Sequence, residues 1–127
     1  MYNKDTIEIR EWTHEIQDWL MQIHGQTFLD MCKELLSINT DSEKYPDRST
    51  TKQAIDNACK PYGLIYDEFK EGGFATRDRW ILEAGDTQYY LQWNTWWNYF
   101  MLYVSNKKLK ISLYTYYINK PLVDTIE

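Results

Sequence analysis

The chain has 127 residues, 43% of them hydrophobic and 26% charged. This predicts one domain, residues 1–127, that buries a core without metals or disulfides. The net charge of −5 divides into −6 for residues 1–74 and +1 for residues 75–127, which excludes the basic footprint of a duplex DNA-binding protein. The N-terminus lacks a signal-peptide core, and no run approaches the roughly 20 apolar residues of a membrane span. We therefore expect a cytoplasmic protein with no membrane partner.

The first predicted elements are two helices. Residues 5–24 have an amphipathic pattern, with one apolar stripe of Trp12, Ile16, Trp19, Leu20 and Ile23. Residues 28–37 have a second stripe, rotated by roughly 140° from the first at about 100° per residue. A break at residues 24–26, which include Gly25, is therefore expected. One continuous helix that serves two surfaces is the alternative.

The middle of the chain contains one more helix and one ambiguous segment. Residues 39–48 are polar and contain a proline, which indicates a loop. Ser49 or Thr50 can cap a third helix, and the Pro and Gly at 61–63 end it, so that the helical part spans about 5–60. Residues 64–71 fit either a short strand or a helical turn.

Residues 74–118 predict an aromatic sheet, since they hold four of the six tryptophans and seven of the eleven tyrosines. Two-residue turns at Gly85-Asp86, Asn94-Thr95 and Asn106-Lys107 divide them into four antiparallel strands. The predicted fold is α+β, with two or three N-terminal helices packed on one face of a four-stranded antiparallel meander. Residues 119–127 form a tail.

The three turns fix which side chains share a face, because alternate residues of a strand point to opposite sides. They pair Leu91 with Asn98 and Leu102 with Ile111. The helix-packed face then consists of Trp80, Leu82, Tyr89, Leu91, Trp93, Trp96, Phe100, Leu102, Val104, Leu109, Ile111 and Leu113. The opposite face consists of Arg77, Arg79, Ile81, Tyr90, Gln92, Trp97, Tyr99, Met101, Tyr103, Tyr114 and Tyr116.

The opposite face is unusually aromatic, because the solvated face of an antiparallel sheet is normally polar. One explanation is β propensity with partial cover from helices or loops. The other is a contact surface for a partner, a second subunit or a ligand. This second explanation predicts a binding site at Tyr90, Trp97, Tyr99, Tyr103, Tyr114, Tyr116, Arg77 and Arg79.

The acids of the first helix are a second candidate site. Glu8, Glu11, Glu15 and Asp18 lie within about 80° of one another on a helical wheel. A solvated helix face explains this arrangement, and so does an acidic stripe for a protein partner with a basic surface.

The sequence shows no pattern typical of catalysis or metal binding. His14 and His24 are about 80° apart on a helix, so they cannot easily share a metal there. Cys32 and Cys59 lack ligand spacing and fit buried small hydrophobes in a reducing compartment. No nucleophile motif or phosphate-binding loop is present. We expect no enzymatic activity, no cofactor and no metal.

The leading hypothesis is a non-enzymatic module that binds another protein. Its expected biological type is a small acidic inhibitor, immunity or anti-defence protein of a phage or mobile element. One alternative is a small-molecule or single-stranded nucleic-acid binder, since bases and sugars stack on Tyr and Trp. The other is a homodimer formed through the aromatic face.

Overall fold

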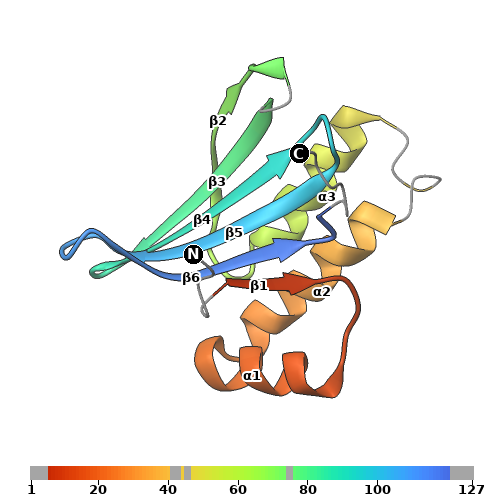
Figure 1. Cartoon of the computed structure of the whole chain (residues 1–127). Helices are drawn as coiled ribbons and strands as arrows, with labels where there is room; N and C mark the ends of the chain where they lie inside the picture. The colour runs from red at the N-terminus through yellow and green to blue at the C-terminus, as the bar shows by residue number, and fades with distance from the viewer. Residues whose placement is uncertain (1–5, 41–43, 45–46, 74–75, 121–127) are drawn as a thin grey trace, which may run out of the picture.

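The computed structural model describes residues 6–40, 44, 47–73 and 76–120. Within them it contains three helices and six strands (Figure 1). In chain order these are β1 (Thr6–Ile9), α1 (His14–His24), α2 (Gln26–Thr40), α3 (Arg48–Cys59), β2 (Ile65–Lys70), β3 (Arg77–Ala84), β4 (Thr87–Asn94), β5 (Tyr99–Asn106) and β6 (Ile111–Ile118). The predicted tail at 119–127 lies outside the described residues from 121 onward.

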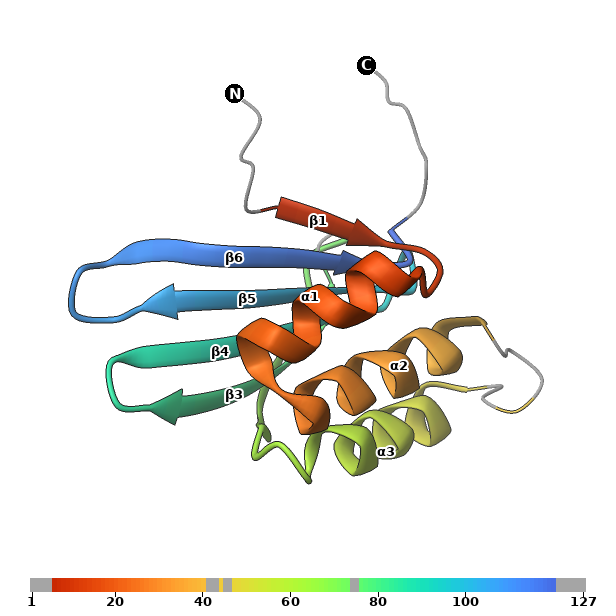
Figure 2. The same cartoon turned by 90° about the horizontal axis from the view of Figure 1, so that it is seen from below.

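The strands form one sheet with the spatial order β1-β6-β5-β4-β3-β2. Strands β2 to β6 form an antiparallel meander, whereas β1 lies parallel to β6. All three helices lie on one side of this sheet (Figure 2). The predicted α+β class is confirmed. The four predicted strands are β3 to β6, and the edge strands β2 and β1 extend them into a mixed sheet of six.

The helix predicted over residues 5–24 is wrong in its first part. Thr6–Ile9 form β1, and α1 begins only after its N-cap Thr13. Ile7 and Ile9 point to the same side of β1, and Ile9 is fully buried. A β-branched residue at every second position favours a strand. The apolar stripe that follows is longer and helical, and the predicted helix wrongly includes this short segment.

The predicted break between the first two helices is confirmed. Gly25 separates α1 from α2 with a φ of 93°, a value that glycine adopts without strain. Helix α2 continues to Thr40, beyond the predicted end at residue 37. Its last turn is held by Asn39, whose side-chain amide donates to the carbonyl of Asn98 over 3.0 Å.

Helix α3 begins earlier than predicted. The carboxylate of Asp47, rather than Ser49 or Thr50, caps it by accepting a hydrogen bond of 2.7 Å from the backbone N–H of Thr50. Its inward residues Ile55 and Cys59 are fully buried against α2 and the sheet. The helix therefore lies where the sequence predicts it, with a slightly earlier start.

The three predicted hairpins differ in how well they match the structure. The first is confirmed, with Trp80 opposite Leu91. In the second, Leu91 lies opposite Leu102 instead of Asn98, a shift of four residues that keeps every strand side chain on its predicted face. In the third, Leu102 lies opposite Tyr116 instead of Ile111, a shift of five residues that reverses the faces of β6.

The two shifted hairpins have longer turns than predicted. Residues 95–98 and 107–110 each form a turn closed by a backbone hydrogen bond, from Asn98 to Asn94 and from Lys110 to Asn106, both of 2.8 Å. Asn98 and Lys110 take positive φ values of 55° and 58°. A register shift between Val104 and Ser105 adds the odd residue to the third hairpin.

The reversed faces of β6 change the predicted core. Tyr116 and Ile118 are fully buried on the helix side, next to Leu102 and Phe100. Three residues predicted for the core are not in it: Leu109 and Ile111 are 64% and 48% exposed, and Trp96 is 58% exposed in the β4–β5 turn.

Candidate functional site

The sheet face turned away from the helices, called the outer face below, carries four tyrosines on β4, β5 and β6. Its residues alternate with those of the helix side, so that Arg79 and Ile81 flank the buried Trp80 on β3. On β3 to β6 they are Arg77, Arg79, Ile81, Tyr90, Gln92, Tyr99, Met101, Tyr103, Thr115 and Tyr117. No described helix covers this face (Figure 2).

The tyrosines of the outer face contact one another across the strands. Tyr90 lies opposite Tyr103, with ring centres 6.5 Å apart in an edge-to-face arrangement. Tyr99 and Tyr117 have ring centres 6.4 Å apart. Met101 lies opposite Tyr117 on the neighbouring strand. All five side chains are half-buried.

Cations border this surface on two sides. The guanidinium of Arg79 lies 4.7 Å from the ring centre of Tyr90 and also bonds its hydroxyl. On β2, the carboxylates of Asp67 and Glu68 form ion pairs with the guanidinium of Arg79, with N···O distances of 2.8 and 2.5 Å. On the other side, the ammonium of Lys120 lies 4.3 Å from the ring centre of Tyr117. Arg79 is therefore neutralised within the chain, and its charge is not available to a phosphate.

Five of the eight residues predicted for the aromatic site lie on the outer face: Arg77, Arg79, Tyr90, Tyr99 and Tyr103. Trp97 lies beside them in the β4–β5 turn, 43% exposed. Tyr114 and Tyr116 lie on the helix side, where the two rings pack against Trp19 with ring centres 5.5 and 5.8 Å away.

The sequence-based prediction put Tyr114 and Tyr116 on the wrong face and did not include Tyr117, because the register error reversed β6. The two β6 tyrosines of the predicted site are thus replaced by Tyr117 and its neighbour Thr115. The signal that would have found them is the Tyr116–Tyr117–Ile118 run, in which only one alternation buries Ile118 against Phe100.

The predicted acidic stripe is not a helical stripe. Glu8 lies on β1, where it pairs with Arg10 over 2.6 Å, and Glu11 lies in the connection to α1. Only Glu15 and Asp18 share α1. The four acids come from three different segments because residues 6–9 form a strand.

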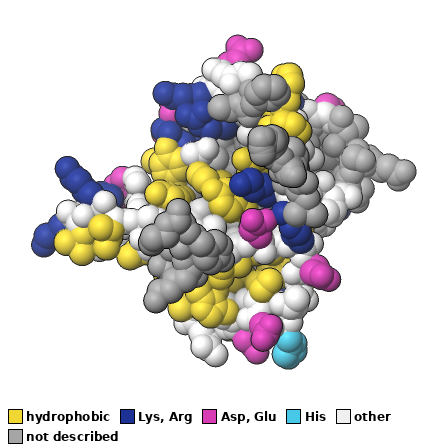
Figure 3. All heavy atoms as spheres, viewed as in Figure 1, with side chains coloured by type: hydrophobic (Ala, Val, Ile, Leu, Met, Phe, Trp, Pro, Cys, Tyr) yellow, Lys and Arg dark blue, Asp and Glu magenta, His cyan; other side chains and the backbone are white. Residues whose placement is uncertain are grey.

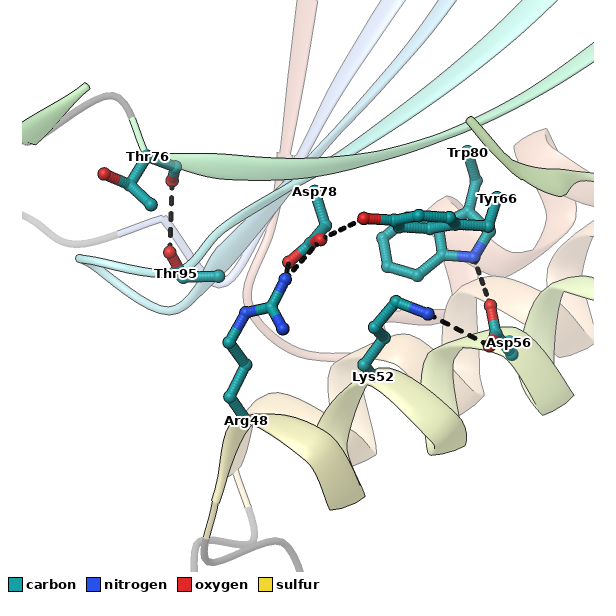
Figure 4. A network of polar contacts seen from close by, with 8 residues as sticks. All are labelled: Arg48, Lys52, Asp56, Tyr66, Thr76, Asp78, Trp80 and Thr95. Atoms are coloured by element: carbon teal, nitrogen blue, oxygen red, sulfur yellow. Dashed lines mark hydrogen bonds and ion pairs between the residues drawn. The ribbon is translucent and has the colours of Figure 1, made fainter. Parts of the chain in front are cut away.

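A polar network joins α3 to β2 and β3 (Figure 4). The carboxylate of Asp78 is fully buried, and one nitrogen of Arg48 donates to its two oxygens over 2.6 and 2.7 Å. The hydroxyl of Tyr66 donates to Asp78 over 2.7 Å. Burial, together with the bond to this carboxylate, raises the pKa of Tyr66 to about 12. The guanidinium of Arg48 also lies 4.7 Å from the ring centre of Phe69.

The same network includes the buried tryptophan of β3. The indole N–H of Trp80 donates to Asp56 over 2.6 Å, and Lys52 pairs with Asp56 over 3.6 Å. Lys52 in turn lies 3.9 Å from the ring centre of Tyr66. Both carboxylates are thus engaged by donors of the chain, which suits them to hold α3 on the sheet rather than to move protons.

The two cysteines and the two histidines of the chain lie in different environments. Burial raises the pKa of the Cys32 and Cys59 thiols, which keeps them protonated. Burial lowers the pKa of His24 to about 4, so its ring is neutral at pH 7. His14 is exposed at the start of α1. In the described part of the chain, no group of three or more His, Cys, Asp or Glu residues is arranged to hold a metal ion.

Comparisons with protein-family models, with curated proteins and with solved structures find no match to this chain. None of the helices in residues 6–40 and 47–73 has the length and apolar character that a membrane crossing requires. The candidate site is the outer face, because its tyrosines are half-buried and no described helix covers them.

Proposed function

We propose that this chain is a non-enzymatic module that binds another protein through the outer face of its sheet. The observation that carries the proposal is the difference between the two faces. Three helices cover one of them, and the other presents Tyr90, Tyr99, Tyr103 and Tyr117 half-exposed with no described helix over them. Tyrosine is enriched in the centres of protein interfaces, where it supplies large contact area and a polar hydroxyl.

The chemistry of the outer face favours a protein over a nucleic acid. Binding of a single strand combines stacking with a positively charged groove that follows the phosphates. Here Arg79 is held by Asp67 and Glu68, and the chain as a whole carries −5. A partner with a flat surface of apolar groups and hydrogen-bond acceptors suits the tyrosine hydroxyls and Met101 better.

The biological type that we propose is a small acidic inhibitor or immunity protein acting in the cytoplasm. Its support is the size and charge of the chain, together with the scarcity of catalytic groups described above. Capture from the native host identifies the partner.

The test compares three forms of the tagged chain in that capture: wild type, the double variant Tyr99→Ala/Tyr103→Ala, and Met21→Ala. Met21 is 42% exposed on α1, away from the outer face, and serves as the control. Central aromatic anchors contribute about 2 kcal/mol or more to a protein complex. We expect a partner that binds wild type and Met21→Ala and loses at least about 30-fold in affinity for the double variant.

Circular dichroism has to show that the double variant remains folded. A partner that binds all three forms equally well would refute the outer face as the contact surface. A catalytic activity detected in the purified wild-type chain would refute the non-enzymatic part of the proposal.

A further inference from the structure

The turn between β5 and β6, residues 107–110, forms a basic and apolar tip. Figure 1 shows this hairpin projecting beyond the helices, and Figure 3 shows Lys or Arg side chains beside hydrophobic ones at that end. Leu109 is 64% exposed and Ile111, the next residue but one, is 48% exposed. Lys107, Lys108 and Lys110 surround them. In a chain with a net charge of −5, this is a local concentration of positive charge.

The tip has a fixed conformation. The side chain of Asn106 accepts a hydrogen bond from the backbone N–H of Leu109 over 2.8 Å, and Lys107 donates its backbone N–H to Asp86 in the neighbouring hairpin over 2.7 Å. The Lys107 ammonium pairs with Glu83 over 2.9 Å. Lys108 and Lys110 form no ion pair with the residues that the structure describes. A partner of this tip therefore meets two cations and two apolar side chains that are already in place.

A groove between α2 and α3 has the complementary character. It has a volume of about 900 Å³ and is lined by residues of α2 and α3 and by Pro61. The α2 wall contributes the exposed acids Asp30 and Glu34, and apolar atoms come from Met31, Ala54 and Ala58. The α3 wall adds neutral hydroxyl and amide groups, so α3 brings no cation to the lining.

We propose that the β5–β6 tip of one copy of this chain binds in the α2–α3 groove of another copy. Leu109 would enter the groove. Lys108 and Lys110 would approach the groove acids Asp30 and Glu34. The same two features cannot meet within one copy, because the β5–β6 turn lies at one end of the sheet, apart from the helices α2 and α3 that line the groove (Figures 1 and 2). The contact uses no outer-face residue, so it is independent of the function proposed above.

The contact joins two different surfaces, and its geometry therefore differs from that of a two-fold dimer. A head-to-tail contact leaves one free tip and one free groove, so assembly continues until a ring closes or a filament grows. The long-range repulsion between acidic copies limits this assembly, and the contact of the tip lysines with the groove acids offsets it. We expect the average mass to rise with protein concentration.

Sedimentation velocity of two charge-reversed forms tests the proposal. Lys108→Glu/Lys110→Glu reverses the tip, and Asp30→Lys/Glu34→Lys reverses the groove. Each form alone has a tip and a groove of the same sign, so we expect its self-association to weaken at least about tenfold. An equimolar mixture contains opposite charges again, and we expect it to associate as strongly as wild type.

The matched control is Glu15→Lys/Asp18→Lys, which makes the same change of charge on α1, outside the groove. It should associate as wild type does. Leu109→Ser removes the apolar contact without changing the charge, and it should also weaken association.

Three results would overturn the proposal. The first is a wild-type chain that stays monomeric up to its highest soluble concentration. The second is self-association that both charge-reversed forms retain. The third is a monomeric chain whose tip binds vesicles of phosphatidylserine and phosphatidylcholine, with loss of that binding in the tip-reversed form, because the tip would then serve a lipid surface.

Discussion

The two faces of the sheet use the same residue types for opposite purposes. On the helix side Trp80, Leu91 and Tyr116 are fully buried, and the indole N–H and the tyrosine hydroxyl have partners within the chain. On the outer face the tyrosines remain half-exposed and contact one another, Arg79 and Lys120. Tyr116 and Tyr117 are neighbours in sequence, yet one belongs to the core and the other to the surface. Register, rather than residue type, therefore decides what each tyrosine does.

The largest contrast between the faces is expected at Trp80. Trp80→Ala removes a fully buried indole and leaves a cavity on the helix side, and it also removes the donor to Asp56. The free energy of unfolding should fall by about 3–5 kcal/mol. Urea denaturation measures it. A loss below about 1 kcal/mol, as for an exposed residue, would mean that the helix side is not packed as described.

A slightly smaller loss is expected at the ion pair of α3. Arg48→Ala leaves the buried carboxylate of Asp78 with Tyr66 as its remaining described side-chain donor, and we expect the free energy of unfolding to fall by about 3 kcal/mol. Adding Asp78→Asn removes the buried charge and should restore part of this loss. If the two changes are simply additive in denaturant melts, the pair does not act as a unit.

The pH dependence of stability should also reflect the helix side. The pKa of His24 is about 4 in the folded chain and 6.5 in an unfolded chain, so the unfolded chain binds the proton first as pH falls. Stability is therefore lost between pH 6.5 and about 4. We expect a loss of about 2 kcal/mol in total, less than the full shift implies, because solvent reaches part of the ring. In His24→Gln this part of the slope should disappear while the carboxylate titrations remain. An unchanged slope in urea melts across that range would contradict the burial of His24.

The smallest effect on stability is expected on the outer face. Tyr103→Ala breaks one cross-strand pair with Tyr90, and we expect a loss of about 1 kcal/mol or less in the isolated chain. The comparison with Tyr116→Ala, which empties a core position, should show a several-fold larger loss there. Equal losses at the two tyrosines would mean that the outer face is covered as well as the helix side is.

The sequence predicts most of the fold and a little over half of the candidate site, and the difference has a physical cause. The Gly85-Asp86 turn has two residues and a glycine with positive φ, so its register follows from local chemistry. The other two hairpins close through four-residue turns in which Asn98 and Lys110 take positive φ, and lysine carries no signal for that conformation. The shift of four residues moved Trp97 into the turn but kept the strand side chains on their predicted faces, and the shift of five exchanged Tyr114 and Tyr116 for Thr115 and Tyr117.

The short strand β1 escaped prediction for a different reason. Its four residues are too few to show a period against the helical stripe that follows, and its pairing partner β6 lies at the other end of the chain. The local sequence pattern is therefore enough to predict the helices and the strands of the meander. Strand β1 can be recognised only when the sheet that it joins is known.

The parallel pairing of β1 with β6 joins segments far apart in the chain, and this bears on how the sheet folds. Thr6 lies opposite Thr115, a separation of 109 residues, whereas each hairpin of the meander closes within a few residues. Closing so long a loop is entropically costly and contributes to slow folding. On a ribosome, β1 emerges first and yet has no strand to join until β6 has been synthesised. We therefore expect β1, and Ile9 with it, to join the sheet after the meander has formed, so that the backbone amides of β1 are the latest in the sheet to gain protection from hydrogen exchange.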